Sequence, residues 1–238
     1  MILGELTMEE FKRALKKTKT LIVPFGAVEA HGRHLPLDTD TRIMREVAEK
    51  ASQRAGVFTA PPVQYGVCTS TGAHPGTIGI TCESLRMLVK DIVRDGCRKG
   101  LRNFILISGH GGGLHVSALR EAGEALIREM EGIKIAALSV YELIGKEVRD
   151  ISETKDDSHA GEVETSLMLY LAPELVKGRS KEEYPRLPRP VIARDKMKYW
   201  PGAVWGNPAK ASKEKGEKMF GIMVDKVVLL IREAAPGR

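Results

Sequence analysis

The sequence predicts a single α/β domain over residues 1–238, built on a central, mostly parallel sheet with helices on both faces. A chain of 238 residues is long for one domain and short for two. Short apolar runs, typical of strands buried on both faces, alternate along it with longer segments of helical periodicity. Because no internal repeat and no linker divides the chain, we expect one domain.

The first eighty residues begin with a helix and then alternate in this way. Thr7-Met8-Glu9-Glu10 is a capping box, which predicts that a helix begins at Met8. The run TLIVPF is short, continuous and apolar, as expected of a buried strand. In order, we expect a helix over 8–17, a strand over 20–25, a helix over 41–55, a weaker strand over 57–60 and a loop over 63–80.

The rest of the chain continues the alternation. The run NFILI is the clearest strand in the sequence, and a glycine loop follows it at 108–113. Residues 177–208 lack periodicity and are rich in Pro, Lys and Arg, so we interpret them as an arm on the surface. In order, we expect a helix from Leu85 that Gly100 ends, a strand over 103–107, a helix over 114–130, a strand over 133–140, and helices over 163–171 and 213–233.

The composition excludes several classes of protein. Ordinary Gly and Pro contents exclude a collagen-like chain, and no apolar run approaches a membrane span. The first ten residues lack the pattern of a signal peptide. Three cysteines without a CxxC pair indicate reduced thiols in a cytoplasmic protein. The net charge of +6 is interleaved with acidic residues, so we expect a solvated face and neither a nucleic acid nor a membrane as partner, with nucleic acid as the minor alternative.

A cluster of polar side chains follows the first predicted strand. Five possible metal ligands fall within twelve residues: Glu29, His31, His34, Asp38 and Asp40. Carboxylate and imidazole together suit zinc, manganese, iron or similar divalent ions. Glu29 and His31 could diverge onto two neighbouring ions, and Asp40 could bridge them. The alternative is a polar turn whose acids cap the following helix.

Similar clusters follow two further predicted strands. His110 lies in the glycine loop after the strand at 103–107, and His159 and Glu162 lie beyond the strand at 133–140. The carboxyl ends of parallel strands meet at one edge of a sheet, where ligands bind in such folds. We therefore expect the three clusters to form one site, which raises the weight of the metal interpretation.

Each cluster also has a simpler interpretation. Gly111–Gly113 could hold a phosphate, but the sequence has neither the P-loop nor the dinucleotide motif. The run HGGG also occurs in esterases, which need a GxSxG nucleophile elbow that is absent here. His159 could cap a helix or satisfy a core hydrogen bond, and Glu162 and Glu164 could be acids favoured by a helix N-terminus. The segment 70–77 alone is typical of a turn.

Four segments, taken together, resemble the creatininase (creatinine amidohydrolase) family. They are GAVEAHGRHLPLDTD at 26–40, the segment 70–77 with its His-Pro-Gly-Thr end, GHGG at 109–112 and HAGEVETS at 159–166. The resemblance runs from near Leu21 to near Leu171. It implies a three-layer α/β sandwich, two divalent metal ions (Zn, Mn or Fe) per chain and a homo-oligomer, commonly a hexamer.

The resemblance also implies roles for individual residues. Glu29 and His110 would hold one ion and His31 the other, with Asp40 bridging both. Creatininase has a further glutamate two residues after its glycine-loop histidine, a position that Gly112 occupies here. We expect Glu162 to replace that ligand.

Other residues are expected to act on the substrate. His159 is the candidate general acid and base, because an imidazole with a pKa of roughly 6.5 exchanges protons near neutral pH. Ser70, His74 and Gly111 are the expected substrate contacts. The tryptophans that creatininase uses over its substrate lack counterparts before His159, so we expect a substrate other than creatinine.

The resemblance implies an amidohydrolase that cleaves a non-peptide C–N bond, a cyclic amide or a formamide, through a metal-bridging water, and these residues suit that chemistry. We expect the substrate to be a small-molecule amide, with or without a phosphate group. Within the family, one branch opens creatinine, a second deformylates a formamidopyrimidine ribonucleotide in flavin and deazaflavin synthesis, and a third trims a peptide during cofactor maturation. A non-catalytic module that binds a nucleotide or phosphate is the alternative from another class.

Overall fold

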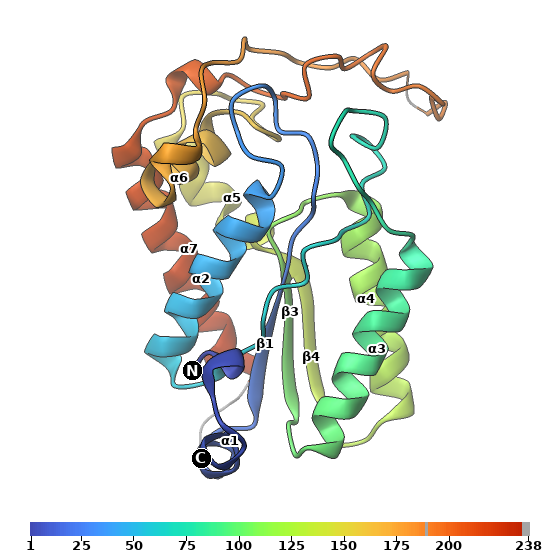
Figure 1. Cartoon of the computed structure of the whole chain (residues 1–238), viewed down its shortest axis with the longest axis vertical. Helices are drawn as coiled ribbons and strands as arrows, with labels where there is room; N and C mark the ends of the chain where they lie inside the picture. Colours follow the sequence, from blue (N-terminus) through green and yellow to red (C-terminus); the bar gives the residue numbers. More distant parts are fainter. Residues whose placement is uncertain (189, 235–238) are drawn as a thin grey trace.

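The sheet has four parallel strands, as the sequence predicts. The computed structural model describes residues 1–188 and 190–234. Its strands are β1 (Thr20–Phe25), β2 (Phe58–Thr59), β3 (Asn103–Ser108) and β4 (Lys134–Ser139). They lie in the order β2-β1-β3-β4, and each neighbouring pair is parallel. All carboxyl ends therefore lie at one edge, the upper edge in Figure 1.

Helices cover both faces of this sheet and complete a three-layer sandwich (Figure 1). One layer contains α2 (Thr39–Ala55), α5 (Val140–Ile151), α6 (Glu162–Leu171) and α7 (Lys213–Ala234). The other layer contains α3 (Cys82–Arg98) and α4 (Gly113–Glu129), with α1 (Met8–Ala14) at its lower end. Short 3-10 turns occur at Leu3–Glu5, Pro173–Leu175 and Pro208–Lys210.

The core lies on both sides of the sheet because successive strand residues point to opposite faces. Ile22 and Ile105 pack with the layer of α2, α6 and α7. Leu21 and Phe104 pack with the layer of α3 and α4. In β1 and β3, the residues that point to one face and those that point to the other are both buried. This explains why these strands are continuous apolar runs in the sequence.

The largest differences from the sequence interpretation are the end of the first helix, the length of β2 and one additional helix. The first helix ends at Ala14, and β2 contains only Phe58 and Thr59. The sequence interpretation assigned no helix after the strand at 133–140, whereas the structure places α5 there. At its start the main-chain N–H of Ser139 donates to the carboxylate of Glu142 at 3.0 Å, and Val140, Ile144 and Val148 are its buried face.

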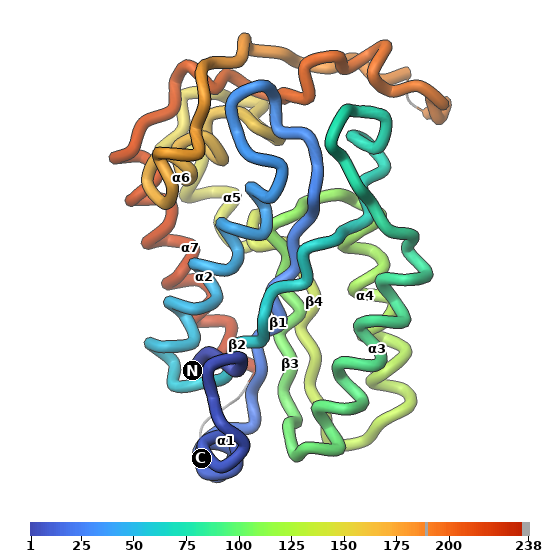
Figure 2. Tube along the Cα trace, viewed as in Figure 1, coloured from blue at the N-terminus to red at the C-terminus, as the bar shows by residue number. Residues whose placement is uncertain are grey.

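The loops at the carboxyl ends of the strands gather at one end of the molecule. Figures 1 and 2 show the segment 176–207 crossing above these loops, where the sequence predicts an arm. Main-chain bridges join Trp205 to His159 and Glu183 to Gly206. The arm is therefore attached to the edge of the sheet where a ligand is expected.

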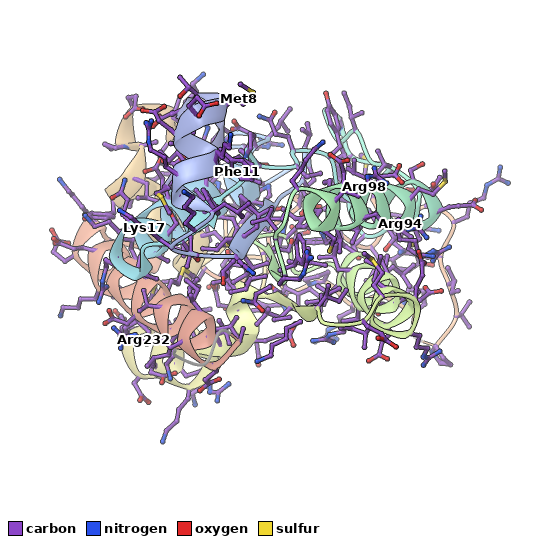
Figure 3. All side chains as sticks on the ribbon, turned by 90° about the horizontal axis from the view of Figure 1, so that it is seen from below. Met8, Phe11, Lys17, Arg94, Arg98 and Arg232 are labelled. Carbon is purple, nitrogen blue, oxygen red and sulfur yellow. The ribbon has the colours of Figure 1, made fainter. Side chains whose placement is uncertain are left out.

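The opposite end of the molecule carries charged side chains. Seen from below in Figure 3, Lys17, Arg98 and Arg232 lie around this end.

The three cysteines are free thiols, as expected. Within residues 1–188 and 190–234, no helix is both long and apolar enough to cross a membrane.

Candidate metal centre

Three connections at the upper edge of the sheet bring together five side chains of types that bind metals. Glu29 and His31 follow β1, and His110 follows β3. Asp40 lies in the first turn of α2, and Glu164 lies in the first turn of α6. All five are buried, so their polar atoms face one another and not solvent.

Asp40 lies at the centre of this group. Its Oδ1 is 3.1 Å from His31 Nε2, and its Oδ2 is 3.2 Å from His110 Nδ1. Its two oxygens thus face two different imidazoles. This is the arrangement that a carboxylate needs in order to bridge two ions.

The other two carboxylates flank the imidazoles. Glu29 Oε1 lies 2.7 Å from His110 Nδ1, and its second oxygen accepts a hydrogen bond from the Thr71 hydroxyl. Glu164 Oε2 lies 3.6 Å from His31 Nε2. Ligand atoms of His31, Asp40 and Glu164 all lie within 4.8 Å of one another, as do those of Glu29, Cys68 and His110.

The outer nitrogen of each ligand imidazole faces a main-chain carbonyl. His31 Nδ1 lies 3.0 Å from the carbonyl oxygen of Glu29, and His110 Nε2 lies 3.1 Å from that of Val67. An N–H that donates to a carbonyl leaves the inner nitrogen free to bind a metal, which is the usual second contact of metal-ligating histidines. The donor set of three carboxylates and two such imidazoles therefore fits two divalent ions.

The electrostatics of the cluster favour cations. Burial alone would lower the pKa of His31, but the carboxylates of Asp40, Glu164 and Glu29 raise it to about 10. Burial likewise opposes ionisation of Asp40, yet His31 and His110 hold the pKa of its carboxyl well below its ordinary value. The carboxylates of Asp40 and Glu29 thus remain charged in a buried site.

The structure does not bring Glu162 to this cluster, which corrects the expectation that it replaces the missing ligand. Its carboxylate lies 2.6 Å from Lys215 Nζ and accepts hydrogen bonds from the main-chain N–H groups of Glu153 and Thr154. Two residues apart in a helix, side chains point about 200° away from each other. Because Glu164 faces the cluster, Glu162 faces the opposite side and anchors the loop before α6.

Two further members of the first polar segment also point elsewhere. His34 contacts the hydroxyls of Thr165 and Ser180, and burial lowers its pKa to about 4. Asp38 pairs with Arg42 at 2.7 Å. Both residues therefore have partners of their own outside the cluster.

His159 lies at the border of the cluster. Its Nε2 is 2.8 Å from the carbonyl oxygen of Ala30, and its Nδ1 is 4.0 Å from Glu29 Oε1. Its ring centroid is 4.2 Å from that of His31 and 5.2 Å from that of Trp200. The ring is thus fixed through one nitrogen, and the other faces the cluster.

The three expected substrate contacts have different surroundings. Gly111 lines a cavity of about 590 Å³ that also borders Glu164. His74 is buried, and its Nε2 lies 2.5 Å from the carbonyl oxygen of Trp200, so it supports the arm. Ser70 is exposed, and the hydroxyl from this bend that reaches the cluster is that of Thr71. The structure thus brings Gly111 to a cavity, and substrate contacts by Ser70 and His74 stay predictions.

Sequence reasoning missed several residues of the site. Thr71 lies in a segment that alone resembles a turn, and Cys68 precedes it. Tyr141, whose hydroxyl donates to Glu164 Oε1 at 3.1 Å, lies in the helix that was not predicted. Trp200 belongs to the aperiodic arm. Only Glu164 had a usable signal, because it occurs in the same motif as Glu162.

Two relatives span nearly the whole chain. A family model for creatininase, described as creatinine amidohydrolase, matches residues 4–231. A mycofactocin precursor peptide peptidase of Mycobacterium ulcerans (strain Agy99) is 32% identical over 254 residues, which cover 99% of this chain and 94% of that protein. A creatinine amidohydrolase of Pseudomonas putida is 30% identical over 261 residues, which cover 99% of this chain and 98% of that protein.

Solved structures of creatininase share the fold. A manganese form has a TM-score of 0.87 and 26% sequence identity, covering 99% of both chains. A mutant creatininase described as a zinc–zinc form has a TM-score of 0.85 and 28% identity, covering 99% of this chain and 98% of that one.

Proposed function

The chain belongs to the creatininase family, and we propose that it is a two-metal amidohydrolase that cleaves a non-peptide C–N bond of a small molecule. The observation that carries this proposal is the position of Asp40. Its buried carboxylate directs one oxygen toward His31 and the other toward His110. Such a carboxylate suits two ions, and zinc, manganese and iron all accept this donor set.

We assign the ligands from the contacts around Asp40. Glu29, Asp40 and His110 would hold one ion, and His31, Asp40 and Glu164 would hold the other. Glu164 thus takes the role that the sequence interpretation gave to Glu162. When bound, two such ions lower the pKa of a water near them and polarise the carbonyl that the water attacks.

Neighbouring groups of the chain fix these ligands in place. Thr71 donates to Glu29, and Tyr141 donates to Glu164. The main-chain N–H of Ala160 donates to the other oxygen of Glu164 at 2.5 Å. Because each flanking carboxylate is held by a donor outside the cluster, its remaining lone pairs point inward.

We propose His159 as the group that moves the proton. Its Nε2–H donates to the carbonyl of Ala30, which leaves Nδ1 unprotonated and directed toward the cluster. Nδ1 can accept a proton from the attacking water and deliver it to the leaving nitrogen. The carbonyl contact holds the ring so that the same atom performs both transfers.

The substrate class is the finer part of the proposal. The relatives are described as a peptide peptidase and a creatinine amidohydrolase, so the family includes both kinds of bond. We propose a cyclic amide or a formamide. A cavity of about 590 Å³ beside Glu164 accommodates a molecule of metabolite size.

The first test is elemental analysis of the purified protein after dialysis. We expect about two divalent ions per chain, and the same sample then enters an activity screen of cyclic amides, formamides and short peptides. Cleavage of peptides alone would overturn the non-peptide assignment. A protein that takes up no metal on reconstitution would favour a non-catalytic module that binds a nucleotide or phosphate.

We also propose a homo-oligomer, with a hexamer as the expected form by family resemblance. Sedimentation velocity of the metal-loaded protein gives its mass directly. A monomer at micromolar concentration would contradict this assignment.

A further inference from the structure

A cavity adjoins the candidate metal centre on one side. It has a volume of about 590 Å³ and lies between α4, α5 and the start of α6. Glu164 and Tyr141 form the wall nearest the cluster, and Arg149 and Lys155 lie in the wall formed by the end of α5 and the loop after it. A molecule bound at the cluster could therefore extend into this space.

Two buried hydroxyls in the cavity wall have no partner. Ser139 is 3% exposed and Thr154 is 4% exposed, and both line the cavity. Within the part of the chain that the structure describes, neither side-chain oxygen has a hydrogen-bond partner. Buried polar groups almost always have one, so these two oxygens indicate a polar ligand in the cavity.

The cavity wall holds three acids and three bases, and each acid has a partner, Glu164 lying 3.6 Å from His31 Nε2, whereas two exposed bases have none among the described residues. Arg120 pairs with Glu142, and the carboxylate of Asp157 accepts the N–H groups of Glu162 and Val163 at 2.7 and 2.9 Å. Arg149 and Lys155 form no ion pair with any residue of 1–188 or 190–234. An anion is the ligand that would compensate them.

The guanidinium of Arg149 is directed along the cavity wall. Its Nη1 would lie 3.6 Å from a Cβ atom added to Gly145, which also lines the cavity. Arg149 thus lies over Gly145, one turn earlier on α5, and both line the cavity.

We infer that this cavity binds an anionic group of the substrate, a carboxylate or a phosphate, through Arg149 and Lys155. Ser139 and Thr154 would hydrogen-bond to polar atoms of the same molecule. This inference rests on the proposed function, since it places the scissile amide at the metal cluster and the anionic group away from it. The substrate is then an anionic amide.

The test measures anion binding by calorimetry, with inorganic phosphate and succinate as separate probes. The variant is Arg149→Gln/Lys155→Gln, and the matched control is Arg128→Gln/Lys146→Gln, whose residues lie on α4 and α5 but do not line the cavity. Each protein is measured metal-loaded and again after chelation, because the ions themselves bind phosphate. We expect the cavity variant to bind at least one probe about 10-fold more weakly in both states, since each lost charge-assisted contact weakens binding.

The two probes distinguish the two kinds of anion. A loss confined to phosphate assigns a phosphorylated substrate, and a loss confined to succinate assigns a carboxylate. Equal affinities in the wild type and the cavity variant, or no binding of either probe at millimolar concentration, would overturn the inference. Metal analysis of the same samples separates the two proposals, because a protein without metal that still binds the anion through Arg149 and Lys155 contradicts only the two-metal function.

Discussion

Asp40 is the side chain on which both proposed ions depend. Its two oxygens face His31 and His110, and no other carboxylate of the cluster lies within ion-pair distance of both imidazoles in the described part of the chain. Asp40→Asn keeps the shape but replaces one oxygen by an amide nitrogen, which cannot bind a cation. We expect the metal content to fall from about two ions per chain to nearly none, with activity lost. A variant that keeps both ions, measured by elemental analysis, would refute the bridge.

Glu162 and Glu164 form a matched pair because they have the same side chain on opposite sides of one helix. We expect Glu164→Gln to lower the metal content to about one ion per chain, since His31 and Asp40 alone hold the second ion weakly. Glu162→Gln should keep both ions. The opposite result would restore Glu162 as the ligand.

Glu162→Gln should instead reduce stability. It breaks a buried contact with Lys215, so the free energy of unfolding should fall by about 2 kcal/mol at neutral pH. Burial raises the pKa of Glu162, but the contacts with Lys215 and the N–H groups of Glu153 and Thr154 hold it below the ordinary value of 4.5. A carboxyl group whose pKa is lowered by folding stabilises the folded state at pH values above its ordinary pKa. This stabilisation is lost as the pH falls through the pKa of the folded state. Urea unfolding at several pH values should therefore show the penalty shrinking below about pH 4.5.

His159 is expected to affect the rate and not the metal content. His159→Ala should lower kcat by about 10²- to 10⁴-fold, the usual contribution of a positioned acid and base. Elemental analysis of the same sample should still find two ions. A loss of metal in this variant would instead make His159 a ligand.

At the scale of residues, the sequence predicts the cluster because its ligands follow strands in order. Glu29, His31, Asp40 and His110 all come together as the resemblance implies. The choice between Glu162 and Glu164 depends on where α6 begins and which way it is rotated, and neither is visible in a motif. The contact between Thr71 and Glu29 could not be predicted, because nothing in the segment 70–77 indicates which of its hydroxyls faces the cluster.

Among the elements, the connection from β3 to α4 holds His110 against the start of α2. A Cβ atom on Gly109 would collide with the main-chain carbonyl of Asp40, whereas one on Gly113 would meet no atom within 4 Å. A side chain is therefore excluded at Gly109 but not at Gly113, although the two glycines are only four positions apart.

We expect Gly109→Ala to lower the free energy of unfolding by about 1–3 kcal/mol, because a well-packed contact must move. Gly113→Ala, its control, should raise it by about 0.4–1 kcal/mol, since alanine restricts the unfolded chain and favours a helix. Chemical denaturation measures both. Equal stabilities of the two variants would show that the contact between this loop and α2 is not a constraint.

The helices and strands that were predicted correctly are those with strong periodicity and clear ends. The helix α5 was missed because it begins directly at the end of β4, so the apolar residues of the strand run into those of the helix. The edge strand β2 was predicted over 57–60, but its two residues are too few for a pattern that would fix its ends. The arm could not be predicted to cross the site, since its contacts depend on the tertiary structure alone.

For the whole molecule, removal of the ions should lower stability. Three buried carboxylates, Glu29, Asp40 and Glu164, lie close together, and they repel one another unless cations are present. A ligand present at 100 times its dissociation constant stabilises the folded state by about 2.7 kcal/mol per site. We expect chelation to lower the Tm, measured by calorimetry, in the wild type and to have little effect in Asp40→Asn.

The site is assembled from connections that are distant in the sequence. His159 contacts the carbonyl of Ala30, 129 positions earlier in the chain. Contacts between residues far apart in the sequence slow folding, because the entropy of loop closure must be overcome before they form. The ligands of both proposed ions are spread from Glu29 to Glu164, so the rate at which a refolding sample takes up its second ion should follow the last, cooperative step of folding and not the first collapse.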